Sequence, residues 1–216
     1  MLTKKGGRYH RRAGWVFTIA MFIVSATSVL LALVNSLVHN LSLMESSFNI
    51  FLTFIGVLSY VTAIYGIRVL KIRNKNGVKT SSFDWFNACL LLISAVIVIV
   101  FGAILRDPLL FWFPFIGLFL GVTQILYMSM GSKYKNERVV EHLTAMLSCG
   151  VSAITAFVVF GAPRILDIDQ VSLLLWFGPT IIIVPIIIVF TKKFRGPKRT
   201  LSTADQFREE NQRIGN

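Results

Sequence analysis

The fold class is decided by the stretch FNACLLLISAVIVIVFGAILRDPLLFWFPFIGLFLG, which runs from Phe86 to Gly121. It contains two apolar runs separated by Arg106, Asp107 and Pro108. An apolar run of about 20 residues, wound as a helix, is long enough to cross the ~30 Å hydrocarbon core of a bilayer. The charged residues interrupt the apolar sequence where the chain would turn at a surface. The stretch therefore predicts two consecutive membrane helices.

The same pattern recurs along the whole chain. Of its 216 residues, 55% are hydrophobic and 15% are charged, whereas soluble domains carry about a quarter of charged residues. The pattern predicts an all-α bundle of six membrane-spanning helices in one domain over residues 1–195, followed by a polar cytoplasmic tail at 196–216. The predicted spans are 15–37, 48–69, 83–105, 109–131, 143–162 and 171–191.

The basic residues predict the orientation of this bundle. Of the 22 Lys and Arg residues, all but Arg106 and Arg164 fall at the same end of the predicted spans. Because Lys and Arg resist translocation, we expect that end, with both termini, to lie in the cytoplasm. The basic loops have few aromatic residues between them, so we expect the lipid bilayer as a partner and no nucleic acid.

The sequence favours no enzyme class. It contains no Gly-rich phosphate loop and none of the patterns HExxH, GxSxG and CxxC, which mark zinc, serine and thiol chemistry. No Asp, Glu, Lys or Arg falls at the middle of a predicted span. This disfavours an ion-coupled transporter, because such proteins keep buried charges for their function.

Small and polar residues predict the buried face of each helix, because helices in lipid associate through close packing. The span 143–162 has the clearest small stripe, and we predict that this helix lies at the centre of the bundle. Its inward face is expected to carry His142, Ala145, Met146, Cys149, Ser152, Ala153 and Ala156. Three further polar residues are expected to be buried: Asn35, Asn87 and Gln124. Gln124 lies deep in its span, so we expect its amide to form a hydrogen bond with another helix, since an unpaired polar group in hydrocarbon costs several kcal/mol.

Two histidines form the leading candidate site. His10 and His142 fall at the predicted cytoplasmic ends of two spans, at similar depth, whereas His39 falls at the opposite end. We predict a cleft at the cytoplasmic leaflet, between the first, second and fifth spans, that binds or transports a small amphiphilic molecule. The residues expected to contact this ligand are His10, Arg11, Arg68, His142 and Met146.

Two alternatives stay open for the same region. In the first, the small face of the fifth span receives a helix of a partner protein, in a structural or regulatory role. In the second, His10 and His142 ligate haem b in a redox protein, since histidine is a common haem ligand. They are the only histidine pair at one depth, and no other metal site is predicted.

Four segments of the sequence resemble a family of bacterial multi-pass membrane proteins that share a domain of unknown function. The segments are KGGRYHRRAGWVF at Lys5–Phe17, YGIRVLK at Tyr65–Lys71, HLTAMLSCGVSAITAFVV at His142–Val159 and WFGPTIIIVPIIIVFTKKFR at Trp176–Arg195. The resemblance implies a protein of the bacterial plasma (inner) membrane and supplies no activity. The positions that it singles out are His10, Arg11, Arg12, Gly14, His142, Met146, Thr155, Ala156 and Phe157.

Overall fold

The computed structural model describes residues 6–39, 47–71, 80–130, 134, 136–161, 165 and 173–197. These residues form helices and no strand. The elements are α1 (Arg8–His39), α2 (Ser47–Arg68), α3 (Ser82–Leu105), α4 (Pro108–Trp112), α5 (Pro114–Met130), α6 (Glu137–Ala156), the π-helical turn η1 (Phe157–Gly161) and α8 (Leu173–Phe194). Six helical segments are long and apolar enough to cross a membrane. This confirms the six predicted spans and gives the architecture of a multi-pass membrane protein.

Two helices begin earlier than predicted. α1 begins at Arg8 rather than at residue 15, and α6 begins at Glu137 rather than at residue 143. The prediction placed each start at the first long apolar run, but a helix continues into polar sequence beyond the hydrocarbon wherever its backbone stays hydrogen-bonded. The predicted tail beyond residue 197 and most of the connecting loops lie outside the described residues.

The fourth span is divided in two by Pro114. Proline has no N–H to donate, and its ring clashes with the carbonyl four residues earlier, so α4 ends at Trp112 and α5 begins at Pro114. Asp107 caps the start of α4, where its side chain accepts hydrogen bonds from the backbone N–H groups of Leu109 (2.9 Å) and Leu110 (3.3 Å). This cap and the helix break shape the hairpin of α3 with α4 and α5.

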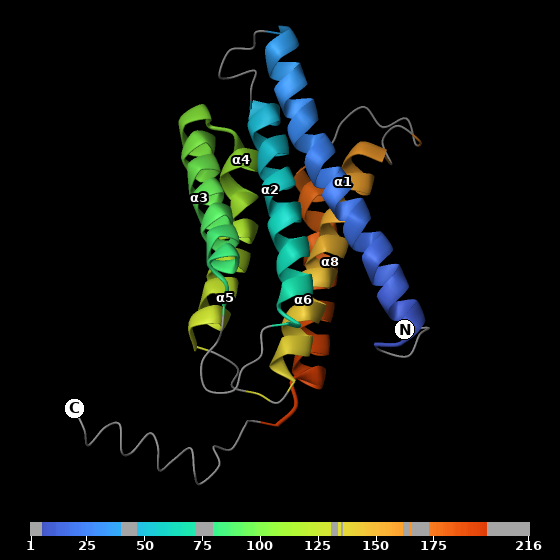
Figure 1. The fold of residues 1–216 in the computed structure, drawn as a ribbon. Helices are drawn as coiled ribbons and strands as arrows, with labels where there is room; N and C mark the ends of the chain where they lie inside the picture. The colour runs from blue at the N-terminus through green and yellow to red at the C-terminus, as the bar shows by residue number, and fades with distance from the viewer. Residues whose placement is uncertain are drawn as a thin grey trace, which may run out of the picture.

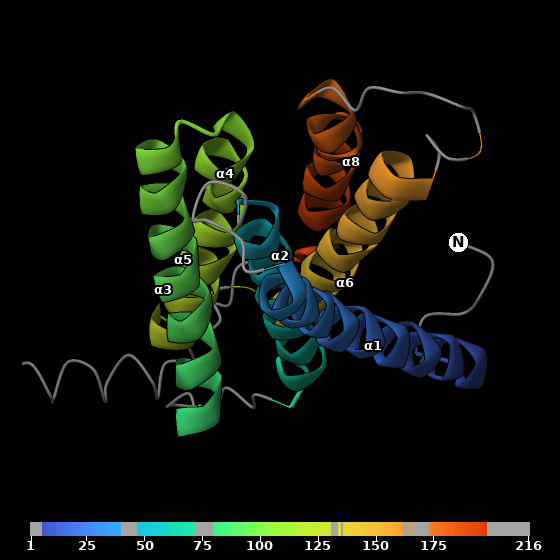
Figure 2. The same cartoon turned by 90° about the horizontal axis from the view of Figure 1, so that it is seen from above.

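The helix at the centre of the bundle is α2. It lies between α3, α4 and α5 on one side and α1, α6 and α8 on the other (Figures 1 and 2). In its most apolar stretch 61% of the residues are buried, against 28% for α6. The prediction of a central fifth span was therefore wrong. Small residues line one face of α6, but α2 has small or polar residues facing several neighbours: Gly56, Ser59, Thr62, Ala63 and Gly66.

The inward face of α6 also differs in detail from the prediction. Ala145 and Cys149 are buried as expected, but Ala153 is exposed and Val151 is buried instead. Near the end of α6, the face that carries its small residues therefore points away from the bundle. Only tertiary packing reveals that rotation, because both residues are compatible with either environment.

Helix α1 packs mainly on α2, along a stripe of small and polar residues. The hydroxyl of Ser25 donates a hydrogen bond of 2.8 Å to the carbonyl of Gly56. Towards its first residues α1 diverges from the other helices (Figures 1 and 2). The buried residues of the stripe are Thr18, Met21, Ser25, Ser28 and Ala32.

Candidate functional site

The structure brings the two predicted histidines together. The ring centroids of His10 on α1 and His142 on α6 lie 6.5 Å apart, with the ring planes inclined by 74°. His10 is exposed and His142 is half-buried. The Nδ1 atom of His142 lies 2.6 Å from the carbonyl oxygen of Gly66 on α2. Groups from α1, α2 and α6 therefore approach one another at this end of the bundle.

Of the other three predicted ligand residues, only Met146 lies near the histidines, because its terminal methyl group lies where a Cβ atom on Gly66 would be. Arg68 instead forms an ion pair with Asp84 of α3, and its guanidinium lies over the ring of Phe83, 4.9 Å from the centroid. Arg11 is exposed on α1. The structure thus groups His10, His142 and Met146 and directs Arg68 towards α3.

The three predicted buried polar residues have different outcomes. Asn35 is half-buried rather than buried, and it donates a hydrogen bond of 2.9 Å to Asn49 of α2. Asn87 is buried, as predicted, and its amide donates to the Phe83 carbonyl of its own helix at 2.7 Å. Gln124 is buried on α5, as predicted.

A cluster that the sequence analysis missed lies between α2, α5 and α6. The hydroxyl of Tyr65 donates a hydrogen bond of 2.8 Å to the carboxylate of Glu141. Tyr127 packs against Tyr65 and Ala145, and its buried hydroxyl has no partner among the described residues. Aromatic residues in an apolar span are usual, so only the relative rotation of the helices reveals that these hydroxyls and the carboxylate share one region.

The Tyr65–Glu141 bond is expected to stabilise the packing of α2 against α6. A hydrogen bond to a charged group contributes about 1.5–3 kcal/mol, so a double-mutant cycle of Tyr65→Phe and Glu141→Gln should give a coupling free energy of about 2 kcal/mol. Titration with SDS in detergent micelles would measure the free energies of unfolding. Tyr9→Phe is the matched control, because Tyr9 is 77% exposed. A coupling close to zero would contradict the assignment.

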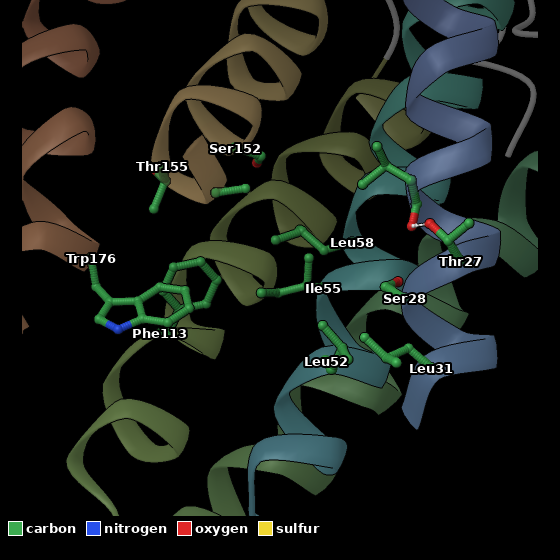
Figure 3. A pocket seen from close by; sticks show the side chains of 12 residues that line it. Thr27, Ser28, Leu31, Leu52, Ile55, Leu58, Phe113, Ser152, Thr155 and Trp176 are labelled. Atoms are coloured by element: carbon green, nitrogen blue, oxygen red, sulfur yellow. Dashed lines mark hydrogen bonds between the residues drawn. The ribbon is translucent and has the colours of Figure 1, made fainter. Parts of the chain in front are cut away.

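An apolar cavity of about 230 Å³ lies nearer the middle of the bundle. Figure 3 shows it between α1, α2, α6 and α8, with Phe113 and Trp176 forming one wall. The sequence predicted a cleft beside His10 and His142, and this cavity is in the other half of the membrane domain. Its lining residues are Val24, Thr27, Ser28, Leu31, Leu52, Ile55, Leu58, Phe113, Ser152, Thr155, Ala156 and Trp176.

The hydroxyl groups of the cavity wall add little polarity. Thr27 donates to the Ile23 carbonyl at 2.8 Å, Ser28 donates to the Ser25 carbonyl at 2.8 Å, and Ser152 donates to the Ser148 carbonyl at 3.2 Å. These donors are already used within their own helices. Apart from Thr155, the other lining residues are aliphatic and aromatic, so the cavity suits a hydrocarbon chain and offers little to a polar head group.

A packed layer separates the cavity from the histidine pair. Met21 of α1, Ala63 of α2 and Cys149 of α6 pack together and are each at most 3% exposed. Along α6, the ten residues from His142 to Ser152 correspond to about 15 Å. The apolar cavity and the histidine pair are therefore two separate places, and the cleft expected beside the histidines stays a prediction.

No family model matches the chain, and neither the curated proteins nor the solved structures contain a significant match. The resemblance to a bacterial membrane family therefore rests on the quoted motifs alone.

Proposed function

We propose that this protein binds or transports a small amphiphilic molecule, and that the cavity between α1, α2, α6 and α8 holds its hydrocarbon chain. The observation that carries this proposal is the apolar wall of the cavity, inside a region made of membrane-spanning helices. Binding sites for small molecules are mostly apolar, with a few polar groups that fix orientation. A cavity of about 230 Å³ has room for part of one hydrocarbon chain.

The chain would enter from the bilayer, beside α1. Helix α1 packs mainly on α2, and α6 packs on α2 and α8, so α1 and α6 form two walls of the cavity without being packed closely together. An alkyl chain could leave the lipid between them and keep its head group at the membrane surface. Each methylene that leaves water contributes about 0.8 kcal/mol, and chains that are already in lipid exchange at little cost.

We further propose that both termini face the cytoplasm of a bacterial cell and that the protein lies in its plasma membrane. The excess of Lys and Arg at the end of the bundle that carries the termini supports this orientation. The motif resemblance supports the bacterial membrane. In this orientation the cavity lies in the half of the bilayer that faces away from the cytoplasm.

Ala156→Trp tests the proposal by filling the cavity. A palmitate analogue with a diazirine in its chain, added to lipid vesicles that contain the protein, should crosslink to cavity residues. The indole would fill the space that the chain needs, and a steric penalty of about 1–3 kcal/mol, typical of overpacking, would lower labelling about tenfold or more. Mass spectrometry of the labelled peptides would measure the change.

Ala153→Trp is the matched control, since Ala153 lies one turn earlier on α6 and is exposed. Labelling of the cavity residues should stay at the wild-type level in this variant. Equal labelling in the wild-type protein and in Ala156→Trp, or labelling spread evenly over the outer surface, would refute the proposal.

A further inference from the structure

We propose that His10 and His142 are the two axial ligands of a b-type haem bound between α1 and α6. This inference goes beyond the proposed binding of an amphiphile and does not depend on it, because the packed layer of Met21, Ala63 and Cys149 separates the two sites. Four observations carry it: the proton on the His142 ring, the spacing of the two rings, the number of protein ligands, and the charges around His10.

The contact with Gly66 sets the protonation of His142. A carbonyl oxygen only accepts hydrogen bonds, so at 2.6 Å the Nδ1 atom of His142 must carry the proton and donate it. In the neutral ring this leaves a free lone pair on Nε2. A backbone carbonyl in this role is the usual partner of a histidine that binds a metal. Gly66 can supply it because it lies in the last turn of α2, where carbonyl groups lack helical partners.

The spacing of the two rings suits one metal between them. An imidazole nitrogen binds a transition metal at about 2.0–2.1 Å, and the ring centre lies roughly 1 Å beyond the nitrogen, so two imidazoles on opposite sides of one metal have centres roughly 6 Å apart. The observed distance between the centroids is 6.5 Å, and the rings are inclined by 74°. Two imidazoles need not be coplanar to ligate one iron.

The number of ligands favours haem over a bare ion. Across the parts of the chain that the structure describes, no group of three or more His, Cys, Asp and Glu residues could hold a metal. A protein zinc site needs three or four such ligands. Haem iron takes four nitrogens from the porphyrin, so two histidines complete its coordination.

The charges around His10 point the same way. Arg8, Arg11 and Arg12 lie within one turn of His10 on α1 and are all exposed. Their positive charges would repel a bare divalent cation, whereas guanidinium groups form strong paired hydrogen bonds with carboxylates such as the two propionates of haem.

The start of α1 has freedom to adjust to a bound ring. His10 is exposed, and a Cβ atom on Gly14 would meet no other atom within 4 Å. This part of α1 also diverges from the other helices (Figure 1). Small movements of α1 relative to α6 would therefore not break the core packing of the bundle.

The test is to titrate the purified protein in detergent with haemin. Absorbance spectra are recorded before and after reduction with dithionite. The wild-type protein should bind stoichiometric haem with the sharp reduced α band of a six-coordinate, low-spin iron. His10→Ala and His142→Ala should each lose that band. His39→Ala is the matched control and should keep it, because His39 lies at the other end of α1.

Each variant is first compared with the wild type by gel filtration and thermal unfolding, to check that it folds. His10→Ala is the less disruptive of the two substitutions, because His10 is exposed. Identical spectra for the wild type and both variants would show non-specific haemin and overturn the proposal. So would the absence of haemin binding. Binding of Zn²⁺ or Ni²⁺ that depends on both histidines, without binding of haemin, would overturn haem and assign a bare ion instead.

Discussion

Gly102→Ala is expected to destabilise the protein by about 3 kcal/mol or more, because the new methyl group has no room. A Cβ atom at this position would press on the backbone of Leu110 and Phe111. A side chain can rotate away from such a contact, but a backbone held in a capped helix cannot, and overpacking of a tight core costs about 1–3 kcal/mol and sometimes more. SDS titration would measure the lost free energy of unfolding.

Gly150→Ala is the matched control for this substitution. Gly150 also lies inside a helix, but a Cβ atom there would meet nothing within 4 Å. Alanine favours a helix over glycine by up to about 1 kcal/mol, so this variant should be as stable as the wild type or slightly more stable. If both variants behaved alike, the close approach of α3 to α4 would not be the cause of the loss.

Gly56→Leu is expected to loosen α1 from α2, at a cost of about 2–4 kcal/mol. A Cβ atom on Gly56 would lie 2.6 Å from the Ser28 hydroxyl and 2.8 Å from a methyl group of Val29. The larger side chain would also separate Ser25 from the carbonyl to which it donates its hydrogen bond. Because α1 packs mainly on α2, α1 has few other contacts to compensate.

The reactivity of Cys149 would report this separation. Cys149 is 1% exposed and packs with Met21 of α1, so labelling with a lipid-soluble maleimide should become faster in Gly56→Leu than in the wild type. Cys89 is exposed and would be replaced by serine in both proteins. Gly14→Leu is the control on α1 itself, because the added Cβ there meets no atom. Unchanged labelling in Gly56→Leu would disprove the role of Gly56.

The six spans could be predicted because each depends only on its own sequence. A run of about 20 apolar residues between charged residues is a sufficient signal for a helix in a bilayer. The buried stripe of α1 could also be predicted, because a helix with one polar face has only one face that avoids lipid. The ends of α1 and α6 could not, since helix propagation beyond the hydrocarbon leaves no mark in hydropathy.

The arrangement of the spans depends on contacts between helices, and these were predicted less well. The small residues of α6 indicated close packing, but they did not show that α2 is the more buried helix. The cavity is formed by α1, α2, α6, α8 and Phe113 between α4 and α5, and no single helix contains a signal for it. Tyr65 and Glu141 lie 76 residues apart, so neither residue alone suggests the other.

The histidine pair is the exception among the contacts between helices. His10 and His142 were matched by depth alone, and their proximity follows because α1 and α6 both contact α2 at the level of Ala63 and Gly66. The depth of the two histidines in their spans could not show that Nδ1 of His142 carries a proton. That proton depends on the carbonyl of Gly66, which lies on a third helix, α2.

The central position of α2 has a consequence for how the chain is made. Neighbours in sequence are also close partners in space: α1 with α2, α3 with α4 and α5, and α6 with α8. During synthesis the chain can therefore enter the membrane as three successive pairs, each of which already buries much of its polar surface. The pair of α1 and α2 leaves the other faces of α2 exposed. The α3–α5 group and then the pair of α6 and α8 can pack on these faces in the order in which they are synthesised.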